Sequence, residues 1–375
     1  MPSQLDAIVI GLGGMGSAAL YHLARRGAKV LGLEQFEIPH DQGSSHGETR
    51  IIRLAYAEHP DYVPLLRRAY ELWRELEVLT NERLLVTTGG IDAGAPDSPT
   101  VQGSLRACQT HQIPHELLTA AELHQRFPGY RLSPEMVAVL QADGGFVLPE
   151  RCIVSHVAAA QSRGAEVHTH ERVITWDRHQ GGIRVTTDRG SYTARKLVLT
   201  AGPWAASLVP RLSKLAVPER QVMLWTQPLH PELFQAATFP IFNLEAPERF
   251  YGFPIYGQIP GFKIGRYHHR QEQADPDRVD RELHPEDEAV LREGIRRFFP
   301  DADGAVLAMK TCLFTNSPDG HFLLDLHPDA PEVVFAAGFS GHGFKFGSVI
   351  GEIMADLALG GATRHGIGLF RLGRF

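Results

Sequence analysis

Three glycines near the start of the chain have the spacing of a phosphate-binding turn. Gly11, Gly13 and Gly16 form the pattern G-x-G-x-x-G directly after an apolar run at residues 7–10. The first glycine permits a tight turn, the second lets a pyrophosphate approach the backbone, and the third lets a helix pack closely on a strand. Glu34 follows roughly 20 residues later, where a carboxylate can accept hydrogen bonds from a ribose hydroxyl. The pattern predicts binding of FAD or NAD rather than NADP.

A strand, a helix and a second strand must position these residues. The sequence predicts a buried parallel strand at residues 7–10, a helix at 17–26 and a strand at 28–33. A helix that begins at such a turn points free N–H groups and the positive end of its dipole at the phosphates. Because every part stands in the required order, we prefer a nucleotide site to a glycine-rich turn without a ligand.

Two arginines come next, at the end of a polar segment. Residues 36–53 are rich in Gly and Ser and are predicted to form a loop. Arg50 and Arg53 stand near its end, and the planar donor fork of arginine suits a carboxylate or a phosphate. The alternative of two solvated arginines stays open, since this residue type is mostly exposed.

A second glycine-rich stretch lies close to the C-terminus. Residues 338–343 follow an apolar run at 333–336 and precede Lys345 and a predicted helix at 349–359. A strand, a glycine-rich turn and a helix again indicate backbone N–H groups directed at a ligand.

The other patterns divide the chain between two interleaved domains of an α/β protein. A helix is predicted at 61–79, a capping box at 119–122 and a helix start at Pro149. Longer strands with aromatic residues follow between about 217 and 314, interrupted by a predicted helix at 285–299. We expect a discontinuous Rossmann-like nucleotide domain and an α+β substrate domain with a mostly antiparallel sheet. The nucleotide domain is expected to comprise residues 1–82, 147–218 and 319–375. The substrate domain is expected to comprise residues 83–146 and 219–318.

The composition limits the classes of function. The 375 residues are 43% hydrophobic and carry a net charge of −6, so we expect neither nucleic acid nor an anionic membrane as a partner. Cys108, Cys152 and Cys312 are too widely spaced for a metal cluster or a disulfide framework, which favours a cytoplasmic location. We expect no metal, signal peptide or membrane span.

Later motifs carry a family resemblance. They are GSSHGETRIIRLAY at 43–56, YGFP at 251–254, the strand of Lys263, CLFTNSPDGHFLLD at 312–325 and AAGFSGHGFKF at 336–346. Over nearly its full length the chain resembles the monomeric sarcosine oxidase and N-methyltryptophan oxidase group of the D-amino-acid-oxidase-like flavoproteins. The last two motifs are the specific ones, because they pair a cysteine and a lysine around a flavin.

The resemblance implies FAD as the cofactor. The implied binding residues are Gly11, Gly13, Gly16, Glu34, Ser44, Arg50, Val173, Gly343 and Lys345. Cys312 matches the cysteine that carries the flavin as a thioether at its 8α-methyl group. That chemistry needs a thiolate, so a cysteine near cationic residues is suitable.

The resemblance also implies a substrate site. Arg53 and Lys345 match the pair that holds the substrate carboxylate, and Tyr251 and Gly341 match residues beside the substrate. Lys263 matches a lysine whose charge stabilises superoxide as oxygen is reduced, and Arg50 and Tyr251 are grouped with the catalytic residues.

A catalytic histidine is implied after Lys263, but the spacing differs from the family pattern. The chain reads Lys263-Ile-Gly-Arg-Tyr-His268-His269, in which Arg266 resembles an insertion. If a strand bulge absorbs the insertion, His268 points into the site, and we choose it. Without a bulge the alternation changes and His269 takes its place.

The implied function is an FAD-dependent oxidase of secondary amino acids, N-methyl or cyclic, that works as a monomer. It would oxidise a C–N bond to an imine and reduce O2 to H2O2. Sarcosine, N-methyltryptophan and pipecolate all stay open as substrates. One alternative is a D-amino-acid-oxidase-like or glycine-oxidase-like dehydrogenase that passes electrons to another acceptor. The others are a non-catalytic flavin-binding module and an NAD-binding protein.

Overall fold

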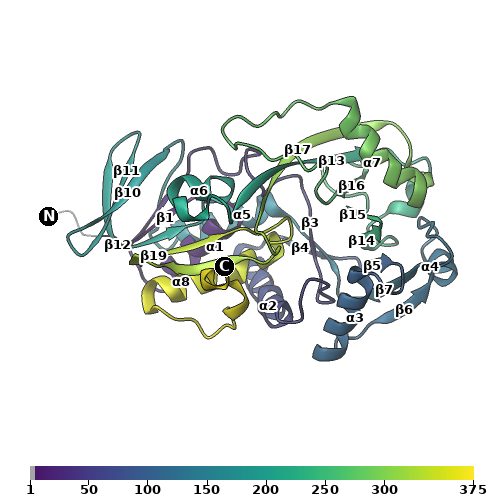
Figure 1. The fold of residues 1–375 in the computed structure, drawn as a ribbon, viewed down its shortest axis with the longest axis horizontal. Coiled ribbons are helices and arrows are strands. Elements are labelled where there is room, and N and C mark those ends of the chain that lie inside the picture. The colour runs from purple at the N-terminus through teal and green to yellow at the C-terminus, as the bar shows by residue number, and fades with distance from the viewer. Residues whose placement is uncertain (1–4) are drawn as a thin grey trace.

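A mostly parallel sheet forms one end of the molecule in the computed structural model, which describes residues 5–375 (Figure 1). Its strands are β1 (Leu5–Ile10), β2 (Val30–Leu33), β9 (Glu166–His168), β10 (Val173–His179), β11 (Gly182–Thr187), β12 (Ser191–Leu199), β18 (Leu323–His327) and β19 (Ala330–Ala337). The order is β10-β11-β12-β1-β2-β9, and β19 pairs with β12 and β18. β9, β2, β1, β12 and β19 pair with one another in parallel, and β9 forms an edge of the sheet.

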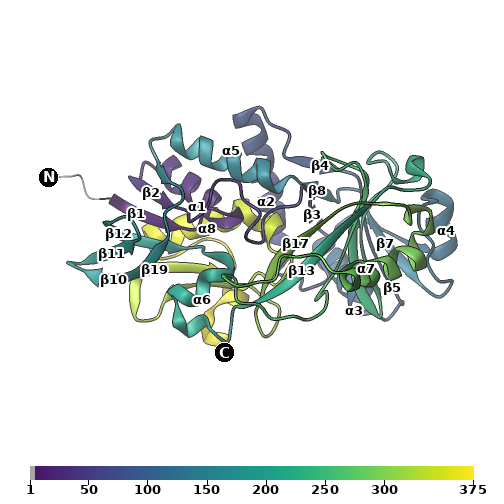
Figure 2. The same cartoon turned by 90° about the horizontal axis from the view of Figure 1, so that it is seen from above.

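Helices cover the central parallel strands. They are α1 (Gly14–Arg25), α2 (Tyr62–Thr80), α5 (Pro149–Gln161) and α8 (Gly347–Gly360), and Figure 2 shows them gathered on one side of the sheet. Ala7 and Val9 of β1 pack into their core, whereas Ile8 packs on the opposite face, near the short helix α6 (Ala205–Leu208). A strand buried on both faces needs an unbroken apolar run, which explains the sequence of β1.

A second, mostly antiparallel sheet forms the other end of the molecule (Figure 1). Its strands are β5 (Gly90–Gly94), β6 (Glu116–Thr119), β7 (Val137–Gln141), β13 (Val217–Thr226), β14 (Ile241–Ala246), β15 (Glu248–Phe253), β16 (Phe262–Arg266) and β17 (Val306–Asn316). They follow the order β17-β13-β16-β15-β14-β5-β7-β6, and of these pairs β5·β14 alone is parallel. The accompanying helices are α3 (Pro99–His111), α4 (Ala120–Arg126) and α7 (Pro285–Phe298).

The predicted fold class is confirmed by these two sheets. The capping box at residues 119–122 is also present, since Thr119 and Glu122 cap α4 reciprocally. Between residues 5 and 375, no helix is long and apolar enough to cross a membrane. The same part of the chain contains no group of three or more His, Cys, Asp or Glu side chains that could hold a metal ion.

One predicted loop is partly wrong. Residues 50–52 form the short strand β3 (Arg50–Ile52), which pairs with β8 (Gly145–Val147), and β8 also pairs with β4 (Leu85–Thr87). Burial of Ile52 and of Phe146 on β8 stabilises this small sheet. A three-residue strand is too short to show a period of two, which explains why the surrounding Gly and Ser dominated the prediction.

Candidate active site

A cavity of about 440 Å³ lies at the carboxyl ends of the parallel strands. Ile10 ends β1, Leu33 ends β2 and Thr200 follows β12, and all three residues line the cavity. In open α/β sheets, ligands bind in the crevice beyond these strand ends. The cavity therefore lies where the fold class places a nucleotide.

The glycine turn leaves room for a ligand at its second position. Gly11 has a φ of +83°, and a Cβ on Gly16 would lie 1.8 Å from the Gly11 carbonyl oxygen. At Gly13, by contrast, the nearest atom to an added Cβ would be Ser45 Oγ at 3.9 Å. Gly13 also gives α1 no side-chain cap, so the first-turn N–H groups face this space. The turn fits a pyrophosphate.

Glu34 lies beside the turn, as a ribose-binding carboxylate must. Its Oε2 accepts a hydrogen bond of 2.8 Å from the Leu12 N–H, and its Oε1 accepts one of 3.1 Å from the Phe36 N–H. The side chain lines the cavity although it is 4% exposed. Two backbone donors thus hold one carboxylate in a fixed orientation towards the nucleotide end.

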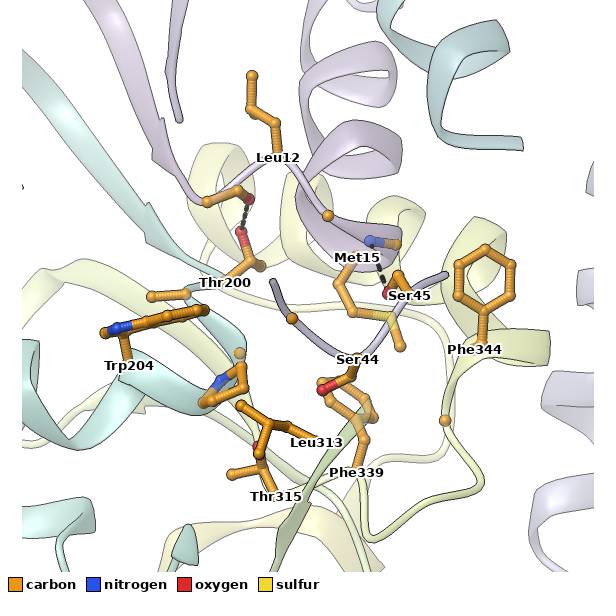
Figure 3. A pocket seen from close by; sticks show the side chains of 18 of the residues that line it. Leu12, Met15, Ser44, Ser45, Thr200, Trp204, Leu313, Thr315, Phe339 and Phe344 are labelled. Carbon is orange, nitrogen blue, oxygen red and sulfur yellow. Dashed lines mark hydrogen bonds between the residues drawn. The ribbon is translucent and has the colours of Figure 1, made fainter. Parts of the chain in front are cut away.

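The segment after β12 also lines the cavity, which the sequence analysis missed. Thr200 Oγ1 donates to the carbonyl oxygens of Ile10 and Gly11 at 3.0 and 2.9 Å. Figure 3 shows Thr200 and Trp204 on one side of the glycine turn and Met15 and Phe344 on the other. The sequence signal for this part of the cavity was an apolar strand followed directly by Gly202 and Pro203.

Arg50 and Cys312 meet beside the cavity. Arg50 and Ser44 line it, and Cys312 lies behind them in a cluster with Met223 and Trp225. The Cys312 Sγ is 3.6 Å from Arg50 Nη2 and 3.7 Å from the Ser44 carbonyl oxygen. The Arg50 guanidinium thus donates directly to the Cys312 sulfur.

Lys263 is fully enclosed on β16. Its Nζ donates to the Gly47 carbonyl oxygen at 2.6 Å and to the carbonyl and hydroxyl oxygens of Thr49, both at 3.0 Å. The Phe253 ring centre lies 4.4 Å from Nζ, and Phe253 lines the cavity whereas Lys263 does not. Burial lowers the pKa of Lys263 well below that of an exposed lysine. The three acceptor oxygens of Gly47 and Thr49 nevertheless match the three N–H groups that a protonated lysine carries.

The structure does not bring His268 to the cavity. β15 and β16 pair without a bulge, from Phe253↔Lys263 to Phe250↔Arg266, so nothing absorbs the additional residue. His268 has a φ of +53° and its ring contacts the Glu219 carboxylate at 3.0 Å, with half of the side chain exposed. That contact raises the pKa of His268.

His269 does not replace it. Its side chain is buried and its Nε2 is 3.0 Å from Asp287 Oδ1, away from the residues that line the cavity. Regular alternation from Lys263 instead brings Gly265 and Tyr267 to the same face, and Tyr267 lines the cavity. The period of two along this strand was the signal that identifies Tyr267.

Arg53 belongs to a buried ion-pair network. Its Nε is 3.1 Å from Asp92 Oδ2 and its Nη2 is 3.4 Å from Glu58 Oε2. Arg249 binds the other oxygen of Glu58 at 2.8 Å. Burial alone would raise the pKa of Glu58, but the charges of Arg249 and Arg53 lower it well below the usual range. Two arginines thus share one ionised carboxylate.

Lys345 lines the cavity and lies beside this network. Its Nζ donates to the His342 carbonyl oxygen at 2.9 Å and lies 5.1 Å from the centre of the Tyr56 ring. Burial, followed by the charge of Arg53, lowers the pKa of Lys345 to about 7. Because the structure gives Nζ this one hydrogen bond among residues 5–375, two N–H groups are available to a ligand.

The neighbouring His342 has a defined tautomer. Its Nε2 lies 2.9 Å from the Gly320 carbonyl oxygen, which can only accept, so Nε2 carries the proton. Its Nδ1 therefore accepts a hydrogen bond of 2.6 Å from the Tyr56 hydroxyl. Burial lowers the pKa of His342 to about 4, so the ring is neutral at pH 7.

The cavity brings most of the predicted site residues together. Those that line it are Gly11, Gly13, Glu34, Ser44, Arg50, Val173, Tyr251, Gly341, Gly343 and Lys345. Gly16, Arg53, Lys263 and Cys312 lie outside its lining, and His268 is separate from it. The residues that the sequence analysis missed include Thr200, Trp204, Tyr267, Phe314 and His342.

Comparisons with known proteins agree with this geometry. Residues 6–357 match the family model described as FAD dependent oxidoreductase. A monomeric sarcosine oxidase from Streptomyces avermitilis is 44% identical, covering 99% of this chain and 97% of the relative. An N-methyl-L-tryptophan oxidase from Yersinia pestis is 34% identical, covering 99% of each chain.

A solved structure shows the same architecture. NikD, described as an unusual amino acid oxidase essential for nikkomycin biosynthesis, superposes with a TM-score of 0.84 at 26% identity, covering 98% of this chain and 97% of NikD. Together with the glycine turn, the ribose carboxylate and the cavity, these matches establish FAD as the cofactor. The chain belongs to the FAD-dependent oxidoreductases and, within them, to the monomeric sarcosine oxidase and N-methyl-L-tryptophan oxidase family.

Proposed function

We propose that the protein oxidises secondary amino acids, N-methyl or cyclic, to imines and passes the electrons to O2, forming H2O2. For a sarcosine-like substrate, water then hydrolyses the imine to an aldehyde and a primary amine. The relatives named monomeric sarcosine oxidase and N-methyl-L-tryptophan oxidase support this substrate class. The name of the first also supports a monomer.

One observation carries the proposal most directly. A single cavity is lined both by Gly13 of the glycine turn and by Lys345. A substrate carboxylate can take the two free N–H groups of Lys345, and Arg53 supplies a second cation nearby. An anchored carboxylate restricts the α-carbon to one position and orientation in the cavity.

When bound, FAD supplies the two-electron redox chemistry. Gly11, Gly13 and Gly16 would hold its pyrophosphate, and Glu34 its ribose. Ser44, Arg50, Val173 and Gly343 support the cofactor from the cavity wall. Tyr251 and Gly341 face the amino acid, and aromatic side chains around it exclude water.

Lys263 serves the oxygen reaction in this proposal. Reduction of O2 develops negative charge on oxygen, which a positive charge fixed by three hydrogen bonds stabilises without reorganisation. Arg50 adds a second positive charge near Lys263.

Oxygen uptake by the holoenzyme tests the function. We expect sarcosine or another secondary amino acid to drive O2 consumption with one H2O2 formed per O2, measured with an oxygen electrode and a peroxidase assay. Turnover with an artificial electron acceptor but without O2 uptake would instead support the dehydrogenase alternative. Absence of turnover with both acceptors across N-methyl and cyclic amino acids would reject the substrate class.

We further propose that Cys312 carries the flavin as an 8α-thioether. The support is its position 3.6 Å from the Arg50 guanidinium and against Ser44, directly behind these two residues of the cavity wall. After acid precipitation of the wild type, we expect the yellow colour to stay with the protein and the intact mass to exceed that of the chain by one FAD. In Cys312→Ala the colour should move to the supernatant. Colour retained by Cys312→Ala would assign the link elsewhere.

Gly265 provides a test of the substrate end. A Cβ at this position would lie 2.4 Å from both Cζ and the hydroxyl oxygen of Tyr251, so Gly265→Ala must move the ring. We expect kcat/KM to fall at least about tenfold and stability to fall by about 1–3 kcal/mol from overpacking. Gly190→Ala is a suitable control, because no atom lies within 4 Å of the added Cβ. Unchanged kinetics in Gly265→Ala would show that Tyr251 does not contact the substrate.

We retain the division of the chain into two interleaved domains as a proposal. The pairing of β5, β7 and β6 into the sheet of β13–β17 supports assigning residues 83–146 together with 219–318. The return of β9–β12 and of β18–β19 to the sheet of β1 and β2 supports assigning 147–218 and 319–375 together with 1–82.

A further inference from the structure

We propose that Tyr267, held by Arg249, is the outer wall of the amino acid site and limits the group that the substrate α-carbon can carry. This inference rests on the proposed function and narrows its substrate class, because a wall at this place favours small secondary amino acids over N-methyltryptophan. It follows from the order of side chains on one face of two paired strands.

β15 and β16 present three rows of side chains to the cavity side. The first row pairs Phe253 with Lys263, and the second pairs Tyr251 with Gly265. Arg249 and Tyr267 form the third row, since the Tyr267 N–H donates to the Arg249 carbonyl oxygen at 2.8 Å. Along the strands, the row of Lys263 is followed by the row of Tyr251 and then by the row in which Arg249 stacks on Tyr267.

Tyr267 closes an arc of aromatic rings at the far end of the cavity. Its ring centre lies 5.3 Å from that of Tyr251 and 5.8 Å from that of Phe314. Phe314 packs directly on Gly341, where an added Cβ would lie 2.3 Å from its ring. The arc therefore connects the strand face to the glycine-rich turn that carries Lys345. A substrate anchored on Lys345 must fit inside this arc.

Arg249 fixes the position of the Tyr267 ring. The guanidinium carbon lies 4.5 Å from the ring centre, and Nη2 donates to Glu58 Oε1 at 2.8 Å. Glu58 is itself held by Arg53, so the guanidinium cannot move freely. Arg249 is not among the residues that line the cavity, whereas Tyr267 is. Arg249 is therefore a positioning residue that acts through the ring.

The backbone adds little restraint beyond this point. β16 ends at Arg266, and His268 and Gln271 both have positive φ values, +53° and +58°. The chain thus leaves the extended conformation directly after Tyr267. Without Arg249, the ring would stand at the end of a strand with only its aromatic neighbours to hold it, so loss of the cation should loosen the wall.

The test compares kcat/KM for sarcosine with kcat/KM for N-methyltryptophan. We expect wild type to favour sarcosine, and Tyr267→Ala to reduce this ratio at least about tenfold, because a pocket wall discriminates by this order. Tyr267→Phe keeps the ring and should keep the ratio. Arg249→Met should reduce the ratio less than Tyr267→Ala does. Arg297→Met is the matched control, since its guanidinium lies 4.8 Å from the Phe298 ring outside the cavity and should not alter the ratio.

A double mutant separates positioning from direct contact. If Arg249 acts through Tyr267, Arg249→Met has no further effect on the ratio in the Tyr267→Ala background. An equal effect in both backgrounds would overturn the positioning role. A ratio within twofold of wild type in well-folded, flavin-replete Tyr267→Ala would overturn the wall itself. Tyr267→Leu serves in place of the alanine variant if that variant does not fold.

A binding measurement distinguishes failure of the wall from failure of the proposed function. If wild type oxidises neither amino acid, the dissociation constants of methoxyacetate and indole-3-acetate are measured from the change in flavin absorbance. Tyr267→Ala should then tighten indole-3-acetate relative to methoxyacetate. An unchanged ratio of the two constants would reject the wall, whereas a shifted ratio without turnover would reject only the proposed reaction.

Discussion

Replacing Lys263 with methionine is expected to slow turnover with O2 by about 10²–10³-fold, the usual effect of removing one preorganised charge from a developing anion. Methionine fills similar space between Phe253 and Trp225 but leaves the Gly47 and Thr49 oxygens without their donor. Lys263 does not line the cavity, so turnover with an artificial electron acceptor should change little. Rates with the two acceptors at saturating amino acid give the comparison.

The pH dependence of the oxygen reaction provides a second readout. Burial, and then the Arg50 charge, lower the pKa of Lys263, whereas Glu150, Cys312 and Glu48 oppose them. Turnover with O2 should therefore fall as the pH rises through this lowered pKa, and Lys263→Met should lack that fall. Lys214→Met, a change at an exposed lysine, is the control. Equal losses with O2 and the artificial acceptor in Lys263→Met would assign the lysine to amine oxidation or to structure instead.

Lys345→Met is expected to weaken binding of a simple carboxylate such as methoxyacetate by about 10²-fold, since charge-assisted hydrogen bonds contribute about 1.5–3 kcal/mol each. The substrate is replaced here by a carboxylate without an amine, because amine deprotonation would add its own pH dependence. The dissociation constant is measured from the flavin absorbance at several pH values.

The sign of the pH effect follows from the lowered pKa of Lys345. Below about pH 7 the free enzyme carries an ammonium there, and above it the lysine loses its proton. Affinity for the carboxylate should be constant at lower pH and decline above about 7, by up to tenfold per unit. The charges of Arg53, Glu58, Arg249 and Asp92 also act on this lysine. Arg53 and Arg249 have raised pKa values and Glu58 a lowered one, so these three groups stay ionised across this range. A decline that persists in Lys345→Met would assign the titration to another group.

The nucleotide half of the site could be predicted because its parts are local. Gly11, Gly13 and Gly16 are adjacent in sequence, and their physical requirements appear as a fixed spacing after an apolar run. The same holds for β1, α1 and β2, whose periodicity extends over whole elements. β3 was missed because three residues carry too little periodicity.

The substrate end could be predicted only in part. Tyr267 follows from alternation along one strand, but the insertion-like Arg266 suggested a bulge that the pairing of β15 and β16 lacks. The network of Arg53, Glu58 and Arg249 joins residues up to 196 positions apart, so no local pattern indicates it. The positions of Lys263 and Cys312 behind the cavity wall likewise depend on tertiary packing.

Anaerobic mixing of the FAD-loaded protein with secondary amino acids tests the central claim most directly. We expect sarcosine or a similarly small N-methyl or cyclic amino acid to bleach the flavin absorption, and air to restore it with one H2O2 formed per flavin. A protein that holds FAD but keeps its colour with every amino acid of this class would contradict the account.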